Sequence, residues 1–267
     1  MAVIPQPAPK GPLVLRQDAD GVATLTLNRA RQYNALSEAM IEALQDALDG
    51  VARDKTVRVV VLAGSGKAFS AGHDLKEMRG TLDQRTYEAL FKKCSRMMLT
   101  MVRLSQPVIA RVHGLATAAG CQLVANCDLA VASTEARFAT SGIRVGLFCT
   151  VPGVALARNV ARKQAFEMLV TGEFVSAEKA AEIGLVNRVV PPNQLDQAVA
   201  DLAGSIIDKS EAAVAAGKQA FYRQLEMGLE SAYMYASEEM ARNMMLHDAG
   251  EGIDAFIDKR KPVWQNR

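Results

Sequence analysis

The chain has 267 residues, of which 49% are hydrophobic and 22% charged, and its formal net charge is +2. This length allows one large domain or two small ones, and the composition is typical of a soluble globular protein. The nearly neutral charge argues against a broad basic surface for nucleic acid, although it leaves room for local basic patches that bind phosphates. The sequence has no run of about 18 apolar residues, so we expect no membrane-spanning helix.

The first residues set the expectation about location. Residues 1–12 hold four of the nine prolines, so we expect a flexible leader. They lack the charged region and long apolar core of a signal peptide, and Lys10 is their only basic residue. We therefore expect a cytoplasmic protein. The four cysteines show no C-x-x-C spacing and are expected to be buried and unpaired, with no metal site.

Residues 13–200 alternate between strand and helix patterns. Asp20-Gly21 separates two strand-like stretches, which predicts a β-hairpin. Ser37 can cap a helix whose apolar residues recur at helical spacing. Further on, the pattern predicts strands at 57–64, 107–114 and 128–133 and a helix at 84–104. This alternation indicates βαβ units and therefore an α/β core.

After residue 150 the pattern becomes mainly helical. We expect helices at 153–172, 193–209, 211–227, 230–247 and 250–258. No Pro/Gly/Ser-rich linker precedes them, so we expect an α/β core over 13–200 with an appended helical subdomain over 201–267. The last helices carry more methionine, alanine and tyrosine than a small subdomain needs, which suggests that they face another subunit; an intramolecular core is the alternative.

Two glycine-containing segments can carry chemistry. The first, GSGKAFSAGHDLKEM (64–78), lacks the third glycine of the dinucleotide fingerprint, and Lys67 precedes alanine where a P-loop needs Ser or Thr. The second, VHGLATAAGCQLVANCDLAVAS (112–133), places small residues where a strand turns into a helix near Ala118. Free N–H groups at such a helix start suit an oxyanion site, but small residues there also permit close packing against a sheet.

Together with three other segments, these two resemble the crotonase superfamily, the enoyl-CoA hydratase/isomerase family. The other three are LNRARQYNALS (27–37), FATSGIRVGLFCTVPG (138–153) and LVTGEFVSAEKAAEIGLVNRVVP (169–191). The resemblance covers nearly the whole chain from residue 13 to residue 265. It implies the α/β crotonase (ClpP-like) fold, made of stacked ββα units, with residues 201–267 as a helical trimerisation subdomain.

The resemblance also implies how a substrate is held. The backbone N–H groups of His73 and Ala119 would donate to the oxygen of an acyl-CoA thioester and stabilise its enolate. The residues implied to contact the substrate or its CoA part are Arg31, Gln32, Tyr33, Lys67, Ala71, Asp74, Leu75, Lys76, Cys149 and Thr150. For each basic residue, an ordinary solvated charge remains the alternative.

The implied partners follow from the same resemblance. Coenzyme A would enter only as part of the substrate, and no cofactor would be bound permanently. The expected partners are an acyl-CoA thioester and further copies of the chain, in a homotrimer or a dimer of trimers. We expect neither nucleic acid nor a membrane among them.

Two positions depart from the pattern of the family's hydratases. The two glutamates that such enzymes use for acid–base chemistry match Gln122 and Gly142 here. Neither residue can act as a base, so ordinary hydration is expected to be weak or replaced by another reaction through an enolate. The His73 ring could take part in proton transfer, or could pack or contact CoA. Two further hypotheses are a non-catalytic acyl-CoA-binding or regulatory protein and a hydrolase that uses Ser70 with His73.

Overall fold

A six-stranded sheet forms the centre of the computed structural model, which describes residues 11–80 and 82–266; most of the predicted leader, residues 1–12, lies outside the described residues. Its strands, in spatial order, are β1 (Val14–Ala19), β2 (Val22–Leu27), β3 (Val59–Gly64), β5 (Val108–Val112), β7 (Leu129–Ser133) and β10 (Arg188–Val190). β1 and β2 pair antiparallel, and the remaining neighbours pair parallel. The predicted α/β class is confirmed.

The hairpin between β1 and β2 forms where the sequence predicts it. Asp20 and Gly21 both have positive φ, 50° and 79°. A two-residue type I′ turn needs this pair of conformations, and its twist matches that of the strands on either side. The next strand, β3, is buried over nearly its whole length. Its continuous apolar run is therefore explained by burial on both faces of a parallel sheet.

A second, four-stranded sheet lies beside the first and gives the fold its repeating unit. It contains β4 (Ala68–Ser70), β6 (Leu115–Thr117), β8 (Arg137–Ala139) and β9 (Val175–Ser176). In three successive repeats a strand of the large sheet is followed by a strand of the small sheet and then by helical structure. This arrangement is the predicted stack of ββα units, and it brings the loops after β4 and β6 to the same edge.

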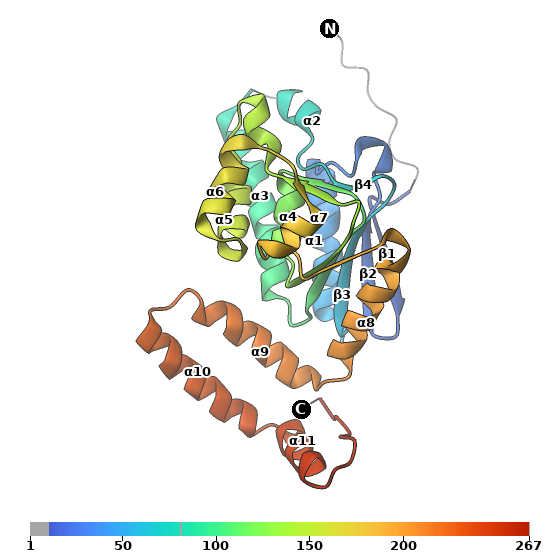
Figure 1. Cartoon of the computed structure of the whole chain (residues 1–267), viewed down its shortest axis with the longest axis vertical. Coiled ribbons are helices and arrows are strands. Elements are labelled where there is room, and N and C mark those ends of the chain that lie inside the picture. The colour runs from blue at the N-terminus through green and yellow to red at the C-terminus, as the bar shows by residue number, and fades with distance from the viewer. Residues whose placement is uncertain (1–10, 81, 267) are drawn as a thin grey trace.

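Helices cover both faces of the large sheet (Figure 1). Val60 and Leu62 of β3 belong to a core packed by α1 and α3, whereas Val59 and Val61 pack with α8 on the opposite face. This alternation is the two-residue period of a strand. The helices are α1 (Glu38–Arg53), α2 (Leu75–Gly80), α3 (Gln84–Arg103), α4 (Ala119–Asn126), α5 (Thr150–Asn159), α6 (Arg162–Thr171), α7 (Ala177–Glu182), α8 (Leu195–Ile207), α9 (Glu211–Gln224), α10 (Leu229–Met244) and α11 (His247–Ile257).

One predicted helix is divided in the structure. The expected helix at 153–172 forms two helices, α5 and α6, separated at Val160 and Ala161, which adopt extended conformations. The side chain of Asn159 donates to the carbonyl oxygens of Ala125 and Ala155. Asn159 at the end of α5 therefore satisfies a carbonyl in the last turn of α4, and this contact lies beyond the reach of local sequence patterns.

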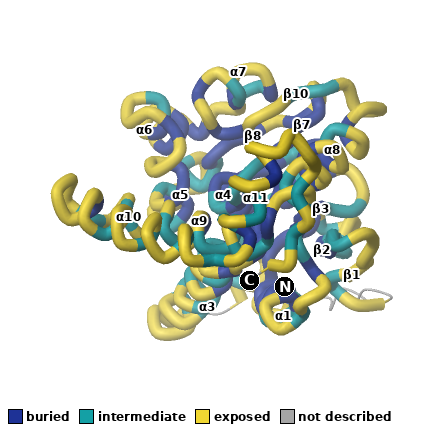
Figure 2. Tube along the Cα trace, turned by 90° about the horizontal axis from the view of Figure 1, so that it is seen from below, coloured by how far each residue is buried: buried dark blue, intermediate teal, exposed yellow. Residues whose placement is uncertain are grey.

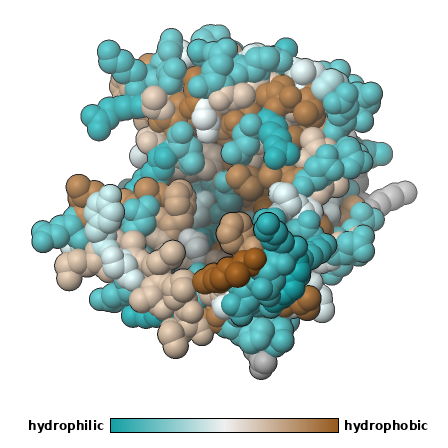
Figure 3. All heavy atoms as spheres, turned by 60° about the horizontal axis from the view of Figure 1, so that its bottom comes forward, coloured by the Kyte–Doolittle hydropathy of each residue, from teal (hydrophilic) through white to brown (hydrophobic). Residues whose placement is uncertain are grey.

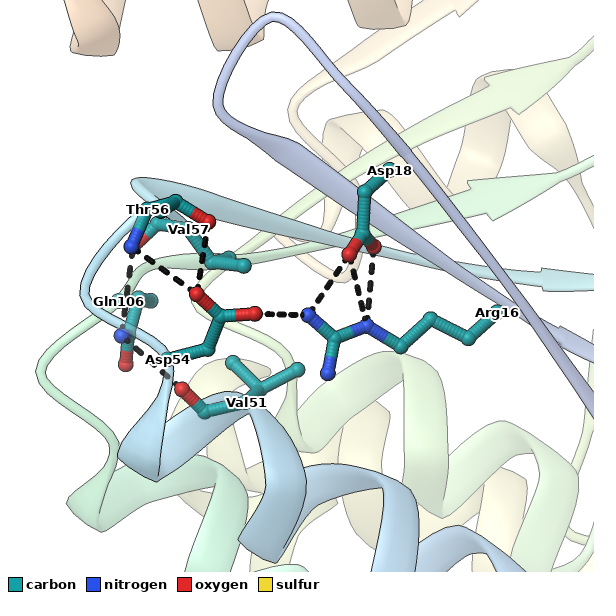
Figure 4. Close-up of polar contacts among 7 residues, drawn as sticks. All are labelled: Arg16, Asp18, Val51, Asp54, Thr56, Val57 and Gln106. Carbon is teal, nitrogen blue, oxygen red and sulfur yellow. Dashed lines mark hydrogen bonds and ion pairs between the residues drawn. The ribbon is translucent and has the colours of Figure 1, made fainter.

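A polar cluster fixes the end of α1 against the hairpin and the loop before β5 (Figure 4). Arg16 on β1 donates to Asp18 and to Asp54, the residue that follows α1. Asp54 also accepts from the backbone N–H and hydroxyl of Thr56. The buried amide of Gln106 donates to carbonyls on both sides of this turn. The core is thereby closed at the end opposite the loops after β4 and β6.

The last three helices, α9 to α11, extend away from the sheets (Figure 1). They are largely exposed, unlike the central strands (Figure 2). Apolar patches interrupt the polar surface at this end of the molecule (Figure 3). The predicted boundary at residue 200 falls inside α8, which packs on the sheet. The division into an α/β core and a trimerisation subdomain stays a prediction.

One buried ion pair joins α9 to the core. Lys218 is 5% exposed as a side chain, and its ammonium group lies 2.7 Å from Asp128. It also donates to the carbonyl oxygens of Met101 and Gln106. Burial lowers the pKa of Lys218, and the attraction of Asp128 opposes this shift. All three hydrogen bonds of the ammonium group are thus made with core residues.

The four cysteines are buried and free, as predicted. Among the described residues, no helix has both the length and the apolar character needed to cross a membrane. In the same part of the chain, no three His, Cys, Asp or Glu side chains gather in a way that could hold a metal ion.

Candidate functional site

The loop after β4 runs alongside Leu36, and this contact orients the backbone of His73. Leu36 donates to the carbonyl of Gly72 at 2.8 Å, and Asp74 donates to the carbonyl of Leu36 at 3.1 Å. The carbonyl of Gly72 and the N–H of His73 belong to one trans peptide group and point in opposite directions, so the N–H of His73 points away from Leu36. The pairing with Leu36 therefore leaves this donor on the opposite side of the loop.

The segment after β6 turns sharply before α4 begins at Ala119. Ala118 has φ 49° and ψ −120°, a conformation that is rare for a residue with a side chain. Strain of this kind costs of order 1–3 kcal/mol and concentrates at functional sites. The N–H of Ala119 is at the first position of the helix, where no intrahelical acceptor exists. The turn therefore presents a backbone donor with the positive end of the helix dipole behind it.

The two segments touch, backbone against backbone. A Cβ placed on Gly72 would lie 2.9 Å from the nitrogen of Ala119 and 2.9 Å from the carbonyl oxygen of Thr117. Gly72 also has φ 85°, which disfavours any other residue. Glycine is required at this position because the residues just before His73 and Ala119 approach each other more closely than a side chain would allow.

A cavity of about 310 Å³ opens beside these two segments. Its walls come from the loop after β4, α2, α3, the start of α4 and the segment before α5. None of the described lining residues is Asp, Glu, Lys or Arg. The lining residues are Ala71, His73, Leu75, Met78, Phe91, Ala118, Ala119, Ser141, Gly142, Val145, Leu147, Phe148, Cys149, Thr150, Val151 and Pro152. The structure therefore brings seven of the predicted site residues to one uncharged cavity.

The other predicted contact residues lie outside the cavity lining. Arg31, Tyr33, Lys67 and Lys76 are exposed. Gln32 is half-buried at the end of a 3-10 turn, Ala30–Gln32. Whether any of them meets coenzyme A stays a prediction.

Asp74 fixes the loop that carries His73. Its carboxylate pairs with Arg29 at 2.7 Å and accepts from the backbone N–H groups of Lys76 and Glu77. Partial burial favours the neutral acid, but the Arg29 guanidinium and the two amides outweigh it and lower the pKa of Asp74. Asp74 therefore stays ionised and holds the start of α2.

Asn34 is a second organiser, and the sequence reasoning missed it. It is fully buried with a positive φ of 53°. Its side chain accepts from the N–H of Arg29 and donates to the carbonyls of Ser65, Ala68 and Phe69. Asn34 thereby ties the 28–37 segment to β4. The available signal was its place in LNRARQYNALS, but no local pattern shows which carbonyls it reaches.

The structure disfavours the hydrolase hypothesis. Ser70 is fully buried, donates to the carbonyl of Asn34 at 2.9 Å and accepts from the N–H of Gly72 at 3.3 Å. Among the described residues, no hydrogen bond joins Ser70 to His73. The hydroxyl therefore supports the loop and is not activated by a base, which a serine nucleophile requires.

The His73 ring is largely buried beside α3. It meets Phe91 edge-on, with 5.4 Å between ring centres, and its Nε2 atom is buried without a hydrogen-bond partner among the described residues. Burial lowers the pKa of His73 to about 4. The ring is therefore neutral at pH 7.

This shift predicts an acid-sensitive stability. Between pH 6.5 and 4 the unfolded chain binds a proton at His73 that the folded chain excludes, so stability is full above pH 6.5 and falls on acidification. Between pH 7 and pH 5 the loss should be roughly 2 kcal/mol. Urea unfolding at pH 7 and pH 5 measures this loss in the wild type and in His73→Gln. The drop in unfolding free energy between the two pH values should be smaller in His73→Gln by about 2 kcal/mol. Equal losses in the two proteins would contradict the prediction.

The two positions that by resemblance carry glutamates differ in their surroundings. Gln122 on α4 is 4% exposed, and its Oε1 atom has no hydrogen-bond partner in the described part of the chain. Gly142 has no room for a side chain, because a Cβ there would lie 2.5 Å from the carbonyl oxygen of Leu147 and 2.8 Å from the sulfur of Cys149. The thiol of Cys149 thus occupies space that a residue at 142 would need.

Comparison with known proteins agrees with the sequence resemblance. A family model described as "Enoyl-CoA hydratase/isomerase" matches residues 17–267. A solved enoyl-CoA hydratase from Mycobacterium smegmatis is 61% identical over 95% of this chain and 99% of its own, with a TM-score of 0.94. The human enoyl coenzyme A hydratase domain-containing protein 3 structure is 46% identical over 94% of this chain and 100% of its own, with a TM-score of 0.91. Its rat counterpart is 44% identical over 97% of this chain and 88% of its own length.

The prediction of a cytoplasmic location is wrong by this comparison. The curated relatives from rat, Xenopus laevis, mouse and human are all named as mitochondrial proteins. The prediction rested on the lack of a targeting pattern in residues 1–12. Such a lack is not a positive signal for any compartment, which is why it misled.

Proposed function

Because the chain belongs to the enoyl-CoA hydratase/isomerase family, we propose that it binds acyl-CoA thioesters and polarises their carbonyl with the backbone N–H groups of His73 and Ala119. One observation carries this proposal: the residues before these two amides touch, and both amides belong to residues that line one uncharged cavity. Fixed donors in such a cavity stabilise negative charge as it develops on an oxygen.

The charged part of coenzyme A belongs outside the cavity under this proposal. A phosphate inside an uncharged cavity would lose its hydration without a compensating charge. Arg31, Lys67 and Lys76 are exposed cations on the segments that lead to the site. They are proposed to meet the nucleotide and pantetheine parts, with Gln32, Tyr33 and Asp74 beside them. Coenzyme A is thus part of the substrate, and no permanently bound cofactor is proposed.

Ordinary hydration is proposed to be weak. The side chain of Gln122 does not titrate, and Gly142 has neither a side chain nor room for one. Each acid–base group typically contributes 10²–10⁴-fold to a rate. Oxyanion stabilisation survives this loss, so the reaction is proposed to be another one that passes through a thioester enolate.

A second candidate function rests on the same lining. Since no carboxylate lines the cavity among the described residues, a non-catalytic protein that binds acyl-CoA for regulation is the alternative. Such a protein would use the two amides to hold the ground-state thioester. It would bind thioesters and release them unchanged.

A panel of acyl-CoA thioesters separates the two functions. Each saturated and unsaturated thioester is incubated with the protein, and mass spectrometry follows hydration, isomerisation and hydrolysis beside a calorimetric binding measurement. Turnover of any member supports the enzyme, and binding without turnover supports the regulatory protein. If no member of the panel binds, both proposals are wrong.

The chain is also proposed to assemble as a homotrimer or a dimer of trimers. The support is the apolar surface of the C-terminal helices, where large apolar side chains are more than half exposed: Phe221, Leu225, Leu229, Tyr233, Met234, Met240, Met244, Met245, Phe256 and Ile257. Patches of this kind mark interaction sites in soluble proteins. A monomeric mass from sedimentation equilibrium at micromolar concentration would contradict the assembly.

A further inference from the structure

The cavity beside His73 and Ala119 is larger and more open than a short acyl group requires. An apolar cavity of about 150 Å³ holds benzene, which has six carbons. The present cavity of about 310 Å³ therefore has room for a hydrocarbon of roughly ten carbons or more by the same measure. Its apolar walls offer no charged side chain among the described residues to bind a polar acyl terminus.

The mouth of this cavity is apolar as well. Leu75 on α2 is 53% exposed, and Val145 and Leu147, which precede α5, are 64% and 45% exposed. All three also line the cavity. These side chains form an exposed apolar rim that is continuous with the apolar cavity. An exposed apolar patch on a soluble protein marks a place where an apolar partner or ligand binds. A chain that fills the cavity and emerges would cover this rim.

We propose that the acyl group is a long hydrocarbon chain of about eight carbons or more, which fills the cavity and extends over a rim formed by Leu75, Val145 and Leu147. The inference rests on the proposed function, because it assumes that the thioester is held at the inner end of the cavity. The rim then determines specificity: it adds affinity only for chains long enough to reach it. Short acyl groups would occupy the inner end alone.

The expected chain-length dependence follows from hydrocarbon burial. Each buried methylene should tighten binding by up to about fourfold. Butanoyl-, octanoyl- and dodecanoyl-CoA, kept below their micelle concentrations, are titrated calorimetrically. We expect affinity to rise by at least tenfold from butanoyl- to dodecanoyl-CoA. A smaller gain, or the reverse order, overturns the inference while leaving the proposed function intact; a failure of all three to bind refutes the proposed function itself.

A rim variant tests the assignment of residues. Val145→Ser combined with Leu147→Ser should weaken the binding of dodecanoyl-CoA by about tenfold and that of butanoyl-CoA by much less. Val154→Ser is the matched control, because Val154 is 54% exposed but does not line the cavity. Val154→Ser should leave the affinity for all three thioesters unchanged. Equal losses for both chain lengths in the rim variant, or a loss of dodecanoyl-CoA binding in the control as well, would overturn the role of the rim.

Discussion

Replacing Ala119 by proline is expected to lower turnover of any acyl-CoA substrate by about 10²–10³-fold, a loss of roughly 3–4 kcal/mol in transition-state stabilisation. The substitution removes one of the two N–H groups that the proposal assigns to the thioester oxygen. Proline is well tolerated at the first position of a helix, where the N–H has no intrahelical partner, and Ala119 is that residue of α4. Steady-state kinetics on the best substrate of the panel measures the loss; for a non-catalytic protein, the affinity for the thioester falls instead.

The control for this substitution is Arg162→Pro. Arg162 is the exposed first residue of α6, away from the cavity, and receives the same backbone change. Both variants should retain their circular dichroism spectra, and Arg162→Pro should keep full activity. Wild-type kinetics and affinity in a folded Ala119→Pro protein would show that this amide is not an oxyanion donor.

Replacing Lys218 by methionine should destabilise the chain by about 3–5 kcal/mol, because it leaves the Asp128 carboxylate buried without its cation. Methionine retains the length of the side chain but cannot donate to Asp128 or to the carbonyls of Met101 and Gln106. The Asp128 side chain is only 13% exposed, so water can replace the lost donor only in part. Urea unfolding followed by circular dichroism gives the change in free energy.

Two comparisons sharpen this test. Lys92→Met removes an exposed lysine, 80% accessible as a side chain and 3.9 Å from Glu88, and should change stability by less than about 0.5 kcal/mol. Adding Asp128→Asn to Lys218→Met should recover part of the loss, since the unpaired charge is then removed. A loss below about 1 kcal/mol in Lys218→Met would mean that the pair does not anchor α9.

Local sequence signals predict much of the fold. The hairpin follows from Asp20-Gly21, because its two positive φ values are a property of those residues. The β3 strand follows from a continuous apolar run, and α1 from Ser37 and the apolar spacing behind it. Each of these features is encoded within about fifteen residues. The stacked ββα order came from the resemblance, since composition and spacing alone do not distinguish it from other α/β folds.

The parts that escaped prediction depend on distant contacts. Lys218 and Asp128 are 90 positions apart in sequence, and neither has a local pattern that names its partner. The positive φ of Ala118 could not be predicted from the residue type, because alanine rarely adopts it. In the same way, the seven predicted residues that line the cavity were identified by resemblance, whereas Phe91 and Met78 entered the site from helices whose packing only the structure shows.

If hydration is weak, as the proposed function holds, the closeness of Gly142 to Cys149 limits how the protein could be engineered into an efficient hydratase. Gln122→Glu alters one side-chain atom and preserves the volume of the residue. The Cβ of a glutamate at position 142 would already clash with the Leu147 carbonyl oxygen and the Cys149 sulfur. Protein engineering or natural selection would therefore first have to place a smaller side chain at position 149 and move the backbone near residue 147. The double variant Gln122→Glu/Gly142→Glu should therefore have a misfolded loop. A well-folded double variant with high hydratase activity would contradict this expectation.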